Sequence, residues 1–139
     1  MDMKKLATLT GIGIISGIVL ALFLKIIKST TGNNVYDLLF DTSYIPVLNE
    51  LSPTWLIESV FHFTTCILSI IVLYYVLRFF HMEKNFFPYF LIIGLGSGVL
   101  YFLTLFSAKT PPITDLAAWM YWVIGHALFS VTAVYLIRR

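Results

Sequence analysis

Four long stretches without a charged residue constrain this chain more than any other feature. They comprise residues 6–24, 59–77, 86–108 and 116–137, and each holds nineteen to twenty-three residues. At a helical rise of about 1.5 Å per residue, nineteen residues cover the ~30 Å hydrocarbon core of a bilayer, whereas a barrel strand needs only about ten. The sequence therefore predicts an all-α, polytopic membrane protein with four transmembrane helices.

The connections predict how these helices are arranged. The helices are expected at about 6–27, 55–79, 86–107 and 116–137, within a single membrane domain that covers residues 1–139. The short connections after the second and third helices favour antiparallel neighbours in a bundle. A long outer loop joins the first two helices, and its apolar residues predict a segment that lies on the membrane surface or caps the bundle.

The composition excludes a soluble domain. Hydrophobic residues make up 59% of the chain, charged residues make up 12%, and the mean hydropathy is +0.90. A soluble protein of this length cannot bury so much apolar surface, and so few charges cannot cover it. The single cysteine, Cys66, excludes an internal disulfide and is expected to pack as a small apolar residue.

Lysine and arginine residues predict the orientation in the membrane. Six of the nine fall on the side of the two termini (Lys4, Lys5, Arg78, Lys84, Arg138 and Arg139), and three fall on the other side (Lys25, Lys28 and Lys109). By the positive-inside rule, both termini are expected in the cytoplasm. This topology also accounts for the net charge of +2, so membrane lipids are the expected partners and nucleic acid is not.

Ionisable residues within the spans suggest a polar pocket. Glu58 and His62 stand four residues apart on one face of the second helix, and counting the helical rise places His62 about 10 Å and His126 about 13 Å below the outer boundary. Because ionisable groups are costly inside a membrane, they are functional candidates by default. We expect an outward-facing pocket formed by His62 and His126 with Glu58, Asp115 and Lys25, in a small proton-responsive or solute-transporting protein.

Other interpretations of these residues are open. The histidines can simply form hydrogen bonds between helices of a structural protein, as a homodimer or as a partner subunit. Two histidines at matched depth can also supply the axial ligands of haem b. Our first expectation, however, is a protein without a cofactor. A metal site that adds Glu58 to the two histidines, or a hydrolase that uses Ser97 with His126, has weaker support, so an enzyme is not expected.

Two pairs of glycines predict close helix packing. Gly13 and Gly17 lie one turn apart in the first helix, and Gly94 and Gly98 do so in the third. Lipid provides no hydrophobic force between helices, so small residues that let backbones approach favour association. These faces are expected to pack inside the bundle or to form a homodimer.

The second half of the chain contains a set of short motifs, namely Thr110-Pro111-Pro112, Asp115-Leu116, Trp119, Gly125-His126 and Ile137-Arg138-Arg139. In these motifs, and more weakly in the first half at His62, the chain resembles the YagU-like family of small bacterial inner-membrane proteins. The resemblance implies a bacterial plasma-membrane location and no established reaction. It supports His62, Asp115 and His126 as functional residues but not Glu58, and the acid expected shortly before Gly125-His126 is replaced here by Trp122-Val123-Ile124.

Overall fold

A computed structural model describes residues 3–50, 54–107 and 111–139, so Lys109 and Thr110 lie outside the described residues. All of the regular structure in these ranges is helical. The elements are α1 (Met3–Thr31), α2 (Val35–Phe40), α3 (Pro46–Glu50), α4 (Trp55–Phe79), α5 (Phe86–Tyr89), the π-helix η1 (Phe90–Leu95), α6 (Gly96–Leu100), the 3-10 helix η2 (Tyr101–Phe106) and α7 (Leu116–Arg138).

Four of these helical segments are long and apolar enough to cross a membrane. They are α1, α4, the continuous segment Phe86–Phe106 and α7, which confirms the prediction of an all-α chain with four candidate spans. We call Phe86–Phe106 the third span. It is not a regular α-helix, because it passes through a wide π turn before α6 and a tight 3-10 turn after it. The Ser97 hydroxyl donates to the Gly94 carbonyl oxygen at 2.7 Å across this change of geometry.

Helix α1 lies at the centre and packs against both α4 and α7. A Cβ atom at Gly13 would lie 2.7 Å from the Ile67 Cα atom of α4, and one at Gly17 would lie 3.0 Å from the Cys66 Sγ atom. On the α7 side, a Cβ atom at Gly125 would lie 2.8 Å from the Leu20 Cδ1 atom. Glycine therefore brings both neighbouring helices close to α1 in the same chain.

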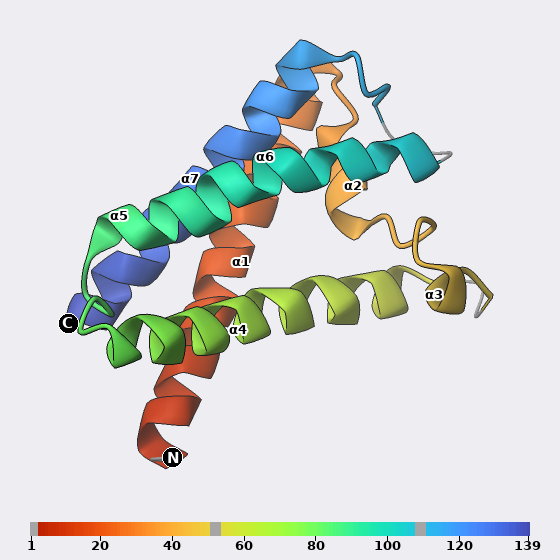
Figure 1. Ribbon diagram of the computed structural model, residues 1–139. Helices are drawn as coiled ribbons and strands as arrows, with labels where there is room; N and C mark the ends of the chain where they lie inside the picture. Colours follow the sequence, from red (N-terminus) through yellow and green to blue (C-terminus); the bar gives the residue numbers. More distant parts are fainter. Residues whose placement is uncertain (1–2, 51–53, 108–110) are drawn as a thin grey trace.

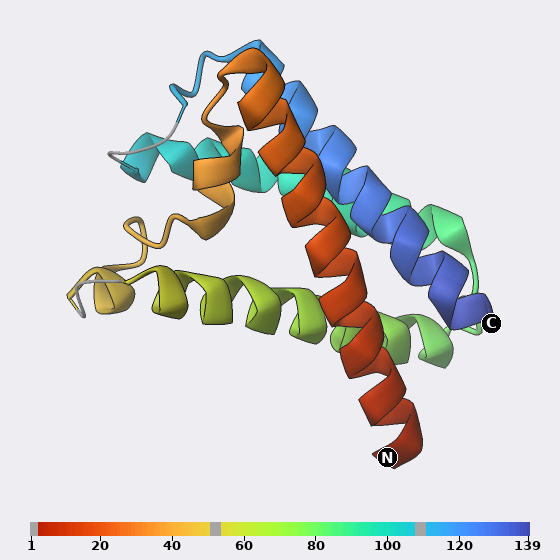
Figure 2. The ribbon, with the colours of Figure 1, turned by 180° about the vertical axis from the view of Figure 1, so that it is seen from behind.

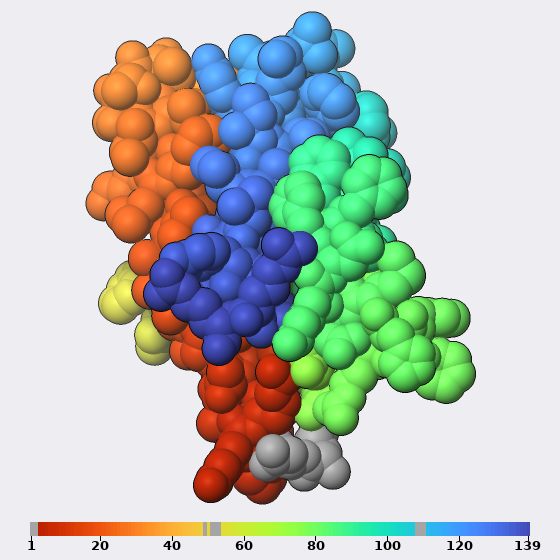
Figure 3. Space-filling model, turned by 90° about the vertical axis from the view of Figure 1, so that its left-hand side faces the viewer, coloured from red at the N-terminus to blue at the C-terminus, as the bar shows by residue number. Residues whose placement is uncertain are grey.

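Helix α7 lies between α1 and the third span (Figure 3). The indole N–H groups of Trp119 and Trp122 donate to the carbonyl oxygens of Gly98 and Ser97, each at 3.0 Å. A Cβ atom at Gly98 would lie 3.0 Å from the Val123 Cγ2 atom. The absence of a side chain at Gly98 and the two indole hydrogen bonds thus set the contact between these helices.

The two ends of the molecule are marked by contacts between distant parts of the chain. At one end, the Lys5 ammonium group lies 4.6 Å from the centre of the Tyr74 ring, and the Arg138 Nε atom donates to the Lys84 carbonyl oxygen at 2.8 Å. We call this the terminal end, because it carries both chain termini and the turn between α4 and α5. The opposite end, where α2 lies, is called the α2 end.

Helix α4 and the third span do not form a close antiparallel pair as the bundle prediction supposed. They meet at the turn between them and diverge toward the α2 end (Figures 1 and 2). Extensive helix contacts join α4 to α1 and α2 but not to the third span, which rests on α7. The loop predicted between the first two spans is also partly helical, since α2 packs against α1, α4 and α7 with Val35, Leu38 and Leu39 buried. The short turn joins α4 and the third span at one end only. Their other ends lie apart because α4 packs against α1 and α2, whereas the third span packs against α7.

Candidate functional site

A cavity of about 810 Å³ lies between α4 and the third span, and α7 closes it from behind. At its rim, Val76, Ile92 and Val99 are 48 to 70% exposed, so it opens sideways between two candidate membrane spans. Most of its lining is apolar. The polar side chains along it include His62, Thr65, Ser69, Ser97, Thr104 and His126, and no Asp, Glu, Lys or Arg is among the described residues that line it.

His62 reaches the cavity from α4 and is buried among aromatic rings and α1. Its Nε2 atom lies 3.4 Å from the Gly17 carbonyl oxygen and 3.7 Å from the Cys66 Sγ atom. Its ring centre lies 5.1 Å from that of Phe40 and 5.0 Å from that of Phe63. Since a carbonyl oxygen only accepts, the neutral ring keeps its proton on Nε2, and Nδ1 is an acceptor that lies 3.9 Å from the Cys66 Sγ atom.

His126 reaches the cavity from α7 and has a defined proton position. Its Nδ1 atom lies 2.8 Å from the Trp122 carbonyl oxygen, so Nδ1 carries the proton and donates. The Nε2 atom of the neutral ring is therefore an acceptor. The Trp122 ring, whose centre lies 4.5 Å from that of His126, holds the imidazole in place and is itself tied to Ser97. A bis-histidine haem would need a nitrogen from each ring, and only His126 has one without a protein contact in the structure.

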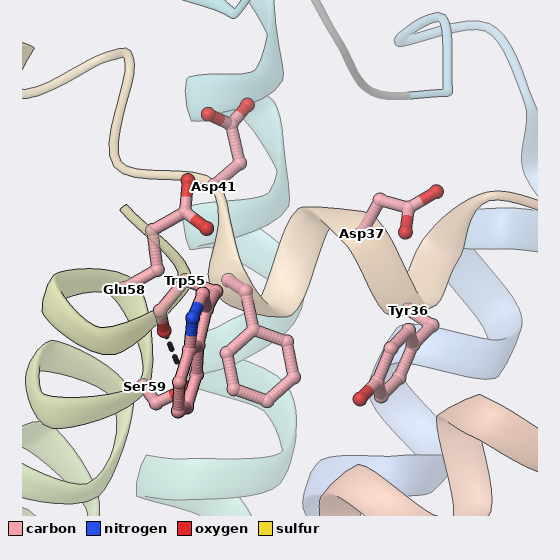
Figure 4. Close-up of a pocket in the computed structure, with 7 residues that line it drawn as sticks. Tyr36, Asp37, Asp41, Trp55, Glu58 and Ser59 are labelled. Atoms are coloured by element: carbon pink, nitrogen blue, oxygen red, sulfur yellow. Dashed lines mark hydrogen bonds between the residues drawn. The ribbon is translucent and has the colours of Figure 1, made fainter. Parts of the chain in front are cut away.

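Glu58 lines a different pocket from the two histidines. This outer pocket, of about 550 Å³, is lined by Tyr36, Asp37, Phe40, Asp41, Trp55, Glu58 and Ser59 (Figure 4). The carboxylates of Asp41 and Glu58 lie at one end of it, and Asp37 lies at the other. Phe40 lines this pocket and its ring also packs against that of His62. Helix α2 therefore separates the outer pocket from the cavity that holds the histidines.

Two of the three acids of the outer pocket, Asp37 and Asp41, have partners of their own. Asp37 forms an ion pair with Lys28 at 2.6 Å. Asp41 accepts hydrogen bonds from the Ser43 backbone N–H at 2.9 Å and from the Ser107 hydroxyl. Among the described residues, no group of three or more His, Cys, Asp and Glu side chains is arranged to hold a metal ion.

The other two residues expected in the pocket lie away from the cavity. Asp115 caps α7, since its Oδ1 atom accepts from the Ala118 backbone N–H and its Oδ2 atom accepts from the Asn33 side-chain amide, both at 2.9 Å. Lys25 is exposed and lines neither the cavity nor the outer pocket. The structure thus brings together His62 and His126 and separates Glu58, Asp115 and Lys25 from them.

No family model, curated protein or solved structure matches this chain. The resemblance to the YagU-like proteins therefore stays a prediction. A helical membrane fold is shared by proteins of many activities, so the function has to be argued from the geometry of the site.

Sequence reasoning missed Thr104 and Tyr44 and considered Ser97 only as a hydrolase candidate. Ser97 and Thr104 lie seven residues apart in the third span, a spacing that places them on one side of a helix and could have indicated a shared surface. Tyr44, between α2 and α3, also lines the cavity. Burial and the nearby carboxylate of Asp41 raise the pKa of Tyr44, so its hydroxyl stays uncharged at neutral pH.

Proposed function

We propose that this chain is an integral membrane protein that binds a small, mostly apolar molecule dissolved in the membrane. The observation that carries the proposal is that His62 and His126, from two different helices, line one lateral cavity, and that no charged residue is among its described lining residues. A volume of about 810 Å³ lies within the range of pockets that bind small molecules. Apolar walls with a few placed polar groups are the usual composition of such sites.

Proton response follows from the chemistry of the histidines. Imidazole is the side chain whose ordinary pKa lies nearest to neutrality, and each ring here accepts a hydrogen bond only while it is neutral. Protonation would put a positive charge into a cavity where no carboxylate is among the described lining residues. We therefore expect acid to weaken the binding of an uncharged ligand. Transport, the other expectation from the sequence, would require α4 to move relative to the third span.

The proposal can be tested by filling the cavity without disturbing the helices. Gly96 lines the cavity, and a Cβ atom there would meet no atom within 4 Å. Gly11, in α1, is equally free of neighbours but does not line the cavity, so Gly11→Phe is a matched control for Gly96→Phe.

The measurement is photocrosslinking of an alkyne-tagged alkyl diazirine to protein in lipid nanodiscs, with the labelled peptides identified by mass spectrometry. We expect saturable labelling of cavity residues in the native protein and in Gly11→Phe, and its loss in Gly96→Phe. Equal labelling of the two variants, or labelling spread evenly over the lipid-facing surfaces, would overturn the proposal.

A further inference from the structure

The polar groups of the cavity are distributed unevenly along its length. Toward the terminal end its lining is apolar, with Val72, Val76, Ile93 and Phe129. The histidines lie in the middle, and Thr104 lies toward the α2 end. From Ser97, beside Trp122, to Thr104 the chain rises about 12 Å along the helix axis, taking ~1.5 Å per α-helical and ~2.0 Å per 3-10 residue. The cavity therefore has an apolar half and a second half, called the polar half, in which polar side chains lie among apolar ones such as Leu39 and Leu103.

Thr104 has a hydroxyl group without a partner. The residue is 6% exposed, and its Oγ1 atom is buried with no hydrogen-bond partner among the described residues. Other threonines in helices of this chain donate to the carbonyl oxygen four residues earlier, namely Thr8, Thr10, Thr30, Thr31 and Thr132. The 3-10 geometry of η2 deprives Thr104 of that bond. A buried hydroxyl without a partner is destabilising, so Thr104 favours a ligand that brings a hydrogen-bonding group to this part of the cavity.

The remaining hydrogen-bonding capacity in the cavity includes several acceptors besides the hydroxyl of Thr104. His126 offers its Nε2 lone pair, because Nδ1 donates to Trp122. The hydroxyl protons of Ser97 and Thr65 are used on the carbonyl oxygens of Gly94 and His62, which leaves the oxygen lone pairs. The unpartnered hydroxyl of Thr104 can also donate, so a complementary ligand both donates and accepts hydrogen bonds, as a hydroxyl group does. Carboxylate and phosphate groups only accept, and no lysine or arginine is among the described residues that line the cavity.

We propose that the ligand is an uncharged, single-chain lipid with a hydroxylated head. Its chain lies toward the terminal end against Val76 and Phe129, and its hydroxyl groups lie between His126 and Thr104 at the α2 end. This assignment rests on the proposed function, since it names the class of molecule that the same cavity binds. An unbranched chain fits a cavity that is open along one side to lipid, and several hydroxyls fit the length of its polar half.

Three probes that differ only in their head test the assignment. They are the 9,10-dibromostearoyl forms of a monoacylglycerol, a free fatty acid and a lysophosphatidylcholine. Bromine quenches indole fluorescence on contact, and Trp122 lines the cavity. The readout is the part of the quenching in nanodiscs that is lost in Trp122→Phe, measured against the mole fraction of probe. We expect the monoacylglycerol to reach half-saturation at about one-tenth of the mole fraction that the other two need, as for one to two extra hydrogen bonds.

A variant of Thr104 separates hydrogen bonding from general fit. Thr104→Val keeps the shape and removes the hydroxyl, so the preference for monoacylglycerol should fall about three- to fivefold. Thr132→Val, which removes a hydroxyl outside the cavity, should leave the preference unchanged.

The outcomes distinguish the two proposals. If all three probes quench Trp122 in a saturable manner with equal strength, or if the acid or the lysophospholipid binds most tightly, the ligand assignment is wrong while the cavity still binds lipophilic molecules. An unchanged preference in Thr104→Val also refutes the assignment. If no probe quenches Trp122 more strongly in the native protein than in Gly96→Phe, the proposed function itself fails.

Discussion

The contact between α1 and α4 gives a sharp prediction about two glycines in one helix. In Gly13→Ala the new Cβ atom would lie 2.7 Å from the Ile67 Cα atom and 3.1 Å from the Ile67 backbone nitrogen. Because these are backbone atoms, α4 as a whole would have to move. In Gly11→Ala the new Cβ atom would meet no atom within 4 Å. The same substitution, glycine to alanine, is thus made against a helix backbone at Gly13 and in open space at Gly11.

The size of the effect follows from these surroundings. Overpacking of a tight contact costs about 1–3 kcal/mol. Replacing glycine by alanine in a helix without a clash stabilises it by about 0.5–1 kcal/mol, since glycine loses more backbone freedom on folding. Both variants gain this backbone contribution, so the clash alone separates them, and we expect Gly13→Ala to be less stable than Gly11→Ala by about 1–3 kcal/mol. Gly17→Ala should be intermediate, because its Cβ atom would meet the Cys66 side chain at 3.0 Å, which can turn away.

The assay is equilibrium unfolding in mixed micelles by titration with sodium dodecyl sulfate, followed by far-ultraviolet circular dichroism. Each variant is compared with the native protein for its free energy of unfolding. Equal stability of Gly13→Ala and Gly11→Ala would refute the reasoning. It would mean that α4 does not rest on the glycine face of α1, and that face would then be free for the homodimer that the sequence also allowed.

Three further measurements test other parts of the structure. Asp115→Ala should lower the free energy of unfolding by about 1–2 kcal/mol, because α7 loses its N-cap, whereas Asp115→Asn keeps an acceptor for the Ala118 N–H and should lose less. The pKa of Tyr44 is raised above 10.0, so the folded state disfavours its ionisation; the melting temperature should fall as pH rises above about 10, and by less in Tyr44→Phe. Protein purified in mild detergent should show no Soret band, because the His62 Nε2 atom faces a carbonyl oxygen.

Each of these three expectations has a contrary result. Equal stability of Asp115→Ala and Asp115→Asn would show that capping does not stabilise α7. Parallel pH profiles for native protein and Tyr44→Phe would show that Tyr44 is not buried beside Asp41. A Soret band that sharpens on reduction with dithionite and is lost in His126→Ala would establish a haem protein and remove the lipid-binding proposal from first place.

The four spans could be predicted from the sequence with little error. A helix that crosses the hydrocarbon core must be apolar over a fixed length, so the uncharged stretches of the sequence are enough to locate the spans. The second and third spans were expected at about 55–79 and 86–107, and the structure has Trp55–Phe79 and Phe86–Phe106. The first span, Met3–Thr31, extends beyond the apolar run at both ends because a helix can continue into the interface. The π and 3-10 turns of the third span have no comparable signal, since hydrophobicity does not distinguish helix types.

The site was predictable only in part. The two histidines were expected at similar depth from the helical rise, and they do line one cavity. Glu58 was expected on the same face as His62, yet it lines another pocket. Spacing along one helix gives the direction of a side chain but not what lies opposite it. In the structure, Phe40 of α2 packs against the His62 ring, and no local pattern in the sequence predicts that contact.

The sequence by itself determined the membrane class, the length of each span and the glycine faces where helices can approach, because these depend on local composition and on the fixed thickness of the bilayer. Only the tertiary structure decided that α4 parts from the third span, because this depends on which glycine face each helix occupies. Lipid does not drive apolar helices together, so close backbone contact and a few polar bonds determine which helices pack together. The cavity between α4 and the third span, with the unpartnered hydroxyl of Thr104, results from this packing.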